Sequence, residues 1–82
     1  MDYKNYRLDK QLYELTDREI MIVDNFIMMV ENHLSLRQLA KEVCRSKSQL
    51  HRDVIELFFI SDELYKLVRE QFTFNIQHVK EK

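Results

Sequence analysis

The sequence contains no glycine, no proline and no tryptophan, and its single cysteine is Cys44. Tight hairpins need residues that tolerate a positive φ, usually glycine, asparagine or aspartate, so the lack of glycine disfavours a β-rich fold. Straight helices joined by short polar turns need neither glycine nor proline. One cysteine cannot form an internal disulfide, which suits a reducing compartment. These absences favour an all-α fold.

Long apolar runs are also lacking. The longest, residues 20–30, is interrupted by Asp24 and Asn25 and is well short of the ~20 residues that a membrane span needs. The sequence does not open on a basic and then apolar leader. We therefore expect a cytoplasmic protein with no membrane partner.

The 82 residues are 45% hydrophobic and 33% charged, which is typical of a globular domain, and we expect one domain over residues 1–82. Three capping boxes begin at Thr16, Ser35 and Ser46, and Ser61 precedes two acidic residues, so four helix starts are marked. Residues 1–15 are expected to form a short helix or an ordered N-terminal arm. The fold class is thus a small bundle of about four helices, predicted over residues 17–32, 36–43, 47–59 and 62–79.

The two middle helices are separated by a very short turn. Only Cys44 and Arg45 lie between the second predicted helix and the Ser46 cap. Two short helices joined in this way are typical of a helix-turn-helix, which we place at residues 35–58. The small side chain of Ala40 is expected to be buried where the helices cross. The apolar residues expected to pack around it are Leu36, Leu39, Val43, Leu50, Val54 and Leu57.

The formal net charge of −1 is unevenly distributed. Residues 1–36 carry −3, residues 37–52 carry +4 and residues 53–82 carry −2. A basic run can be merely a solvated helix surface. Here it coincides with the part of a helix-turn-helix that meets DNA, which favours double-stranded DNA as the partner.

The side-chain types in this basic segment suit DNA contacts. The second helix begins near Lys47, and its first turns would enter the major groove. The residues predicted to read bases are Lys47, Ser48, Gln49, His51 and Arg52. The residues predicted to contact phosphates are Arg37, Lys41, Arg45 and Ser46.

The sequence contains no recognisable motif for an enzyme active site or for a cofactor-binding site. No nucleophile and base pair or glycine-rich loop is recognisable, and the three histidines lack the spacing of metal ligands. We therefore expect no enzyme activity, no metal, no cofactor and no small-molecule ligand.

Residues 39–43 (LAKEV), 46–48 (SKS) and 51–53 (HRD) resemble the helix-turn-helix of the stage III sporulation protein D family of bacterial transcriptional regulators. The resemblance implies a sequence-specific regulator of transcription with a second DNA contact at its basic C-terminus, which here would be His78, Lys80 and Lys82. Cys44 stands where that family usually has glycine, and Glu81 where it has glycine near its end. A phage or plasmid regulator of the same build fits equally well.

Two alternatives remain open. The helix-turn-helix could be a scaffold that binds another protein, such as a repressor or a polymerase subunit. The resemblance implies a regulator that can bind as a monomer, whereas the apolar residues Met21, Met28, Phe72 and Phe74 favour a two-fold homodimer that would cover them.

Overall fold

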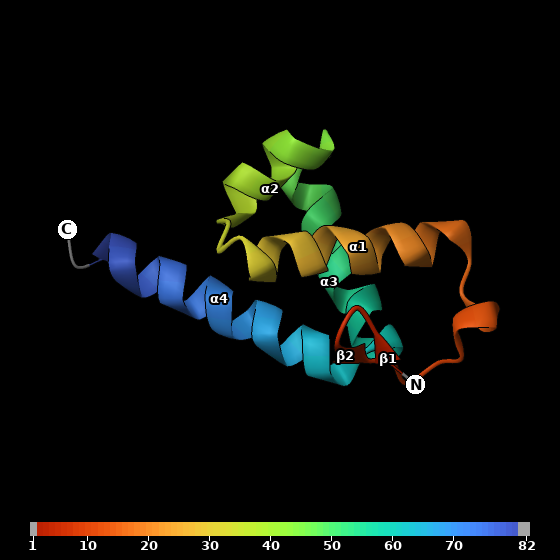
Figure 1. Cartoon of the computed structure of the whole chain (residues 1–82). Helices are drawn as coiled ribbons and strands as arrows, with labels where there is room; N and C mark the ends of the chain where they lie inside the picture. The colour runs from red at the N-terminus through yellow and green to blue at the C-terminus, as the bar shows by residue number, and fades with distance from the viewer. Residues whose placement is uncertain (1, 81–82) are drawn as a thin grey trace.

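The structure is a computed structural model that describes residues 2–80, with side chains described for residues 3–72. It confirms the all-α fold class (Figure 1). A hairpin of β1 (Asp2–Tyr3) and β2 (Tyr6–Arg7) and a 3-10 helix η1 (Leu12–Glu14) precede four helices. These helices are α1 (Asp17–Glu31), α2 (Leu36–Val43), α3 (Lys47–Ile60) and α4 (Asp62–Lys80).

The helix starts are set by local hydrogen bonds. At the start of α1, the Thr16 hydroxyl accepts the Glu19 N–H at 3.1 Å, and the Glu19 carboxylate accepts the Thr16 N–H at 3.0 Å. Ser35 and Ser46 form the same reciprocal boxes before α2 and α3. Because each box satisfies backbone N–H groups that the helix itself leaves unpaired, the predicted starts of these three helices are confirmed.

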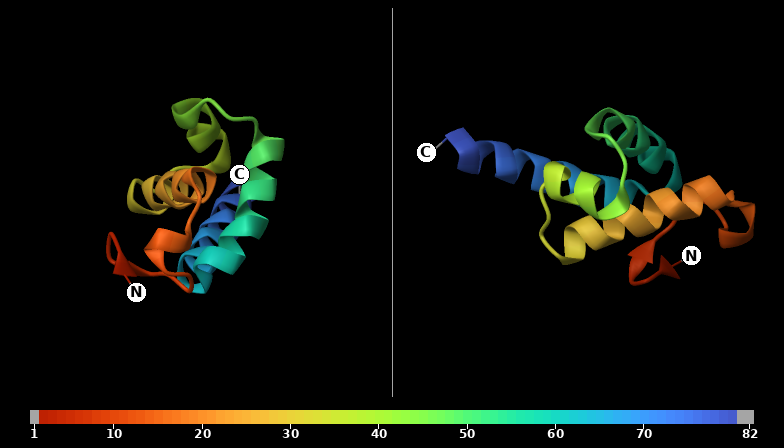
Figure 2. Two further views of the ribbon diagram at one scale, coloured as in Figure 1. Left: turned by 90° about the vertical axis from the view of Figure 1, so that its right-hand side faces the viewer. Right: turned by 90° about the horizontal axis from the view of Figure 1, so that it is seen from above.

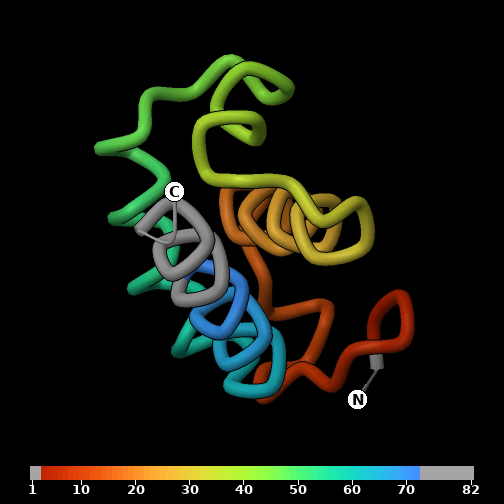
Figure 3. Tube along the Cα trace, turned by 90° about the vertical axis from the view of Figure 1, so that its left-hand side faces the viewer, coloured from red at the N-terminus to blue at the C-terminus, as the bar shows by residue number. Residues whose placement is uncertain are grey.

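Helices α1 and α3 each pack against the other three helices, and α1 lies on the opposite side of the bundle from α3 (Figures 1 and 2). Helix α3 lies at the edge of the bundle, beside α4, in the left view of Figure 2 and in Figure 3, which look at the molecule from opposite ends. The loop between α1 and α2 is held by α4, because the Gln71 amide donates to the carbonyls of Met29 at 2.8 Å and Leu34 at 2.7 Å. The buried apolar core comprises Leu8, Ile22, Val23, Phe26, Ile27, Met29, Leu39, Leu50, Val54, Leu57, Ile60, Leu64 and Val68.

The N-terminal arm is ordered, but as a hairpin and a 3-10 helix rather than an α-helix. Its turn places Lys4 at φ 50° and Asn5 at φ 76°, so asparagine supplies the positive φ that glycine would otherwise provide. The Tyr3 hydroxyl donates to Asp24 at 2.7 Å, and this hydrogen bond raises the pKa of Tyr3. The arm continues to the junction of α3 and α4, where the Ser61 hydroxyl donates to the carbonyl of Arg7.

Asn25 of α1 is buried, although the helical spacing of the apolar residues predicts that it lies on the opposite, polar half of the helix.

Candidate nucleic-acid interface

Helices α2 and α3 pack together through a tight turn. Cys44 ends α2 in the left-handed conformation, with φ 56° and ψ 43°, and the Arg45 N–H donates to the carbonyl of Ala40 at 3.2 Å. A non-glycine residue in this conformation costs about 1–2 kcal/mol. The side chain of Cys44 is exposed. The residues between the two helices thus form the turn that the sequence predicted.

The packing between these helices differs in detail from the prediction. Leu39 and Leu50 are completely buried between the helices and the core, and Val54 is buried as well. Ala40 is only partly buried, packed against the same cluster. The expected full burial of this small residue is therefore not observed.

The predicted base-reading residues lie at the exposed start of α3. We call these residues the reading face: Lys47, Ser48, Gln49, His51 and Arg52, all of them exposed. The His51 and Phe72 rings pack edge to face, with centroids 6.0 Å apart. The Gln49 side chain is already engaged, because its carbonyl oxygen accepts the Ser46 N–H at 3.2 Å. The sequence had assigned Gln49 both to the capping box and to base reading, and the structure shows the first role.

Two of the predicted phosphate contacts, Arg37 and Lys41, are exposed on α2. Ser46 is exposed too, but its hydroxyl accepts the Gln49 N–H at 3.1 Å as the cap of α3. The side chain of Arg45 turns inward and is only 18% exposed. We therefore correct the assignment of Arg45, because its guanidinium is bound to a carboxylate of the same chain.

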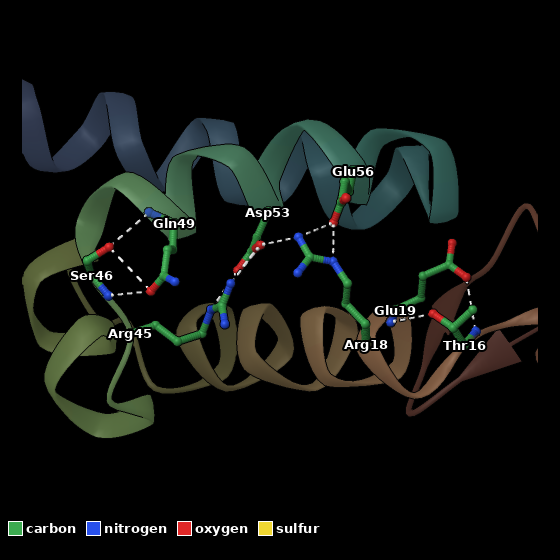
Figure 4. A network of polar contacts seen from close by, with 8 residues as sticks. All are labelled: Thr16, Arg18, Glu19, Arg45, Ser46, Gln49, Asp53 and Glu56. Carbon is green, nitrogen blue, oxygen red and sulfur yellow. Dashed lines mark hydrogen bonds and ion pairs between the residues drawn. The ribbon is translucent and has the colours of Figure 1, made fainter.

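That carboxylate belongs to Asp53, whose side chain is 1% exposed. Two N–H groups of Arg45 donate to it, at 2.9 and 3.2 Å, and Arg18 of α1 approaches it at 3.5 Å (Figure 4). Arg18 also pairs with Glu56 at 3.1 Å. The helix-turn-helix turn, α3 and the start of α1 are thus joined by one ion-pair network.

This ion-pair network was not predicted from the sequence. A signal for it exists, since Asp53 follows Leu50 by three residues and precedes Leu57 by four, and so lies on the inward side of its helix. A charged residue at such a position needs a partner of opposite charge. The sequence offers several nearby cations, and only the folded chain shows that Arg45 and Arg18 are the ones used.

The charge of Arg45 is used in the pair with Asp53, so the formal charge of residues 37–52 without Arg45 is +3 instead of +4. The four remaining cations of this segment are exposed and make no ion pair with the residues whose side chains are described. They lie on α2 and on the first two turns of α3. These cations are Arg37, Lys41, Lys47 and Arg52.

Other predicted features can be placed in part. Met21, Met28 and Phe72, expected as apolar surface, are partly buried against the core. Phe74 and the predicted tail contacts His78, Lys80 and Lys82 lie outside the residues with described side chains. Among residues 2–80, no cluster of three potential ligands could hold a metal ion, and none of the helices combines the length and apolarity to cross a membrane.

Comparison with protein-family models, with curated proteins and with solved structures gave no match to this chain.

Proposed function

We propose that this protein is a sequence-specific DNA-binding regulator of transcription that inserts the start of α3 into the major groove. The observation that carries the proposal is the coincidence of two features on one surface. The exposed start of α3 carries side chains that can bond base edges, and the neighbouring helix α2 of the same motif adds two exposed cations, Arg37 and Lys41, that make no ion pair with the described side chains.

The roles divide by position along the two helices. Arg52 suits a guanine, because a guanidinium can donate two hydrogen bonds to its major-groove edge, while Lys47, Ser48 and His51 can reach neighbouring base edges. Arg37 stands at the start of α2, where backbone N–H groups also favour a phosphate. Together with Lys41 it would fix the orientation of the protein on the duplex.

The dependence of affinity on salt tests this proposal. Phosphate contacts release counterions, so binding to mixed-sequence DNA should weaken steeply as salt rises. Replacing Arg37 with alanine should reduce the slope of log affinity against log salt by about one and weaken all sequences alike. Lys66→Ala is the matched control, because it removes the same charge from α4, where Lys66 is 71% exposed and paired with Asp62. The slope of this control should equal that of the wild type.

One observation favours the alternative, a scaffold that binds another protein. Ile55, Phe58 and Phe59 of α3 are exposed, at 64%, 46% and 64%. Apolar side chains gathered on a surface commonly mark an interaction site. A folded wild-type protein that fails to bind mixed-sequence DNA at low salt would overturn the DNA-binding proposal in favour of this alternative.

A further inference from the structure

The exposed apolar residues of α3 form one continuous surface. Phe58 contacts Phe59 edge to face, with ring centroids 5.3 Å apart, and Tyr65 on the other side at 5.1 Å. Ile55 precedes the two phenylalanines by three and four residues, which makes them neighbours on the helix surface. We call Ile55, Phe58 and Phe59 the apolar patch.

We propose that the apolar patch is a two-fold interface with a second copy of this chain, so that the protein is a homodimer. The charge around the patch fits self-association. Phe59 borders a shallow hollow lined by Thr16, Arg18, Glu19 and Glu56. Arg18 and Glu56 are paired at 3.1 Å, so this border carries both signs of charge, and two identical surfaces can meet without like-charge repulsion.

The area is also appropriate for a dimer core. With about 200 Å² for each fully exposed side chain, the exposed fractions of the three residues give about 350 Å² of patch per copy, or about 700 Å² for two copies. A specific interface buries at least about 1,200 Å² in total, of which somewhat more than half is apolar. The patch alone thus supplies most of the apolar area that a small dimer interface needs.

The position of the patch on α3 adds a geometric argument, which rests on the DNA-binding function proposed above. The mean position of the patch is about eight residues after the mean position of the reading face, or about 12 Å along the helix. Two copies joined at the patch would separate their reading faces by about 24 Å along the helix axes if the α3 helices pack side by side. The separation is about 34 Å if the helices lie end to end with ~10 Å between them. The end-to-end arrangement matches one turn of DNA, ~34–36 Å.

The test is sedimentation equilibrium of the whole chain without DNA, in the range of tens of micromolar. We expect a species of twice the 10.1 kDa chain mass. Phe59→Ser should raise the dissociation constant at least tenfold, because an aromatic residue at the centre of an interface contributes much of its affinity. Tyr13→Ser is the matched control, since Tyr13 is an aromatic residue outside the patch with 83% exposure. Its dissociation constant should be unchanged. Circular dichroism verifies that both variants are folded.

A monomeric wild type, or a Phe59→Ser variant that dimerises as tightly as the wild type, would overturn the inference. The two proposals can fail separately. A dimer that binds no DNA would leave the interface standing without the proposed function, and a monomer that binds an asymmetric site would leave the function standing without the interface. On DNA, the dimer should select two inverted half-sites about 10 base pairs apart.

Discussion

The pair between Arg45 and Asp53 gives the most informative prediction, because it separates a structural role from a DNA contact. Arg45 was assigned to phosphate binding from its place in a basic segment, and the structure ties it to a carboxylate that is 1% exposed. Substituting Arg45 with methionine keeps most of the side-chain length and removes the charge. The buried carboxylate of Asp53 then retains only Arg18, at 3.5 Å.

The magnitude follows from the difference in burial between the partners. Removing one member of a buried ion pair costs ~3–5 kcal/mol, because the other charge is left uncompensated. Arg18 is 54% exposed and can offset ~1 kcal/mol of this, so we expect Arg45→Met to lower the free energy of unfolding by about 2–4 kcal/mol. In a domain of this size that loss lowers Tm by about 10–25 °C. Asp53→Asn should cost less, about 1–3 kcal/mol, because the guanidinium left behind can reach water.

The assay is a double-variant cycle by urea unfolding, followed by DNA binding. The pair Arg45→Met and Asp53→Asn should cost less together than the sum of the single losses, by about 0.5–3 kcal/mol. Arg45 pairs with Asp53 and is not expected to contact a phosphate, so the salt slope of the double variant for DNA binding should equal that of the wild type. An additive cycle would refute the structural role of the pair. A salt slope reduced by about one would show that Arg45 contacts phosphate after all.

Three further predictions concern single residues. Arg52→Ala should weaken binding to a selected DNA site by about 1–3 kcal/mol in competition assays and leave binding to mixed-sequence DNA nearly unchanged. An equal loss of affinity for the selected site and for mixed-sequence DNA would instead identify Arg52 as a phosphate contact. The hydrogen bond from the Thr16 backbone N–H, and after it the one from the Lys10 side chain, lower the pKa of Glu19 below its usual range. The charged Glu19 therefore stabilises the fold above the ordinary carboxyl pKa, and this stabilisation is lost as the pH falls through the lowered pKa of Glu19. Glu19→Gln should therefore lower the free energy of unfolding near neutral pH but not at about pH 3, and an equal loss at both pH values would contradict this. Cys44→Gly should raise the free energy of unfolding by about 0.5–1 kcal/mol in urea, because it removes the cost of the left-handed conformation, and a destabilised variant would show that the thiol side chain stabilises the turn.

The sequence by itself determined the helices and the turn between α2 and α3. The starts of three helices can be predicted from Thr16, Ser35 and Ser46, because a capping box is formed entirely by residues three positions apart. The short connection after Val43 is equally local, and the αL conformation of Cys44 follows from the need to end one helix and begin another within three residues. The Lys4 and Asn5 turn was missed, although Asn5 carries the usual signal for positive φ.

Only the tertiary structure decided which polar side chains are used inside the molecule and which remain available outside it. Arg45 and Arg37 are both basic residues of one segment, yet Asp53 engages the first and the second is exposed. Asn25 is buried although helical spacing puts it on the polar half of α1, and Ile55, Phe58 and Phe59 are exposed on α3, which lies at the edge of the bundle. Helical periodicity gives the direction of each side chain from its own axis, but burial and pairing depend on what the other helices place in that direction.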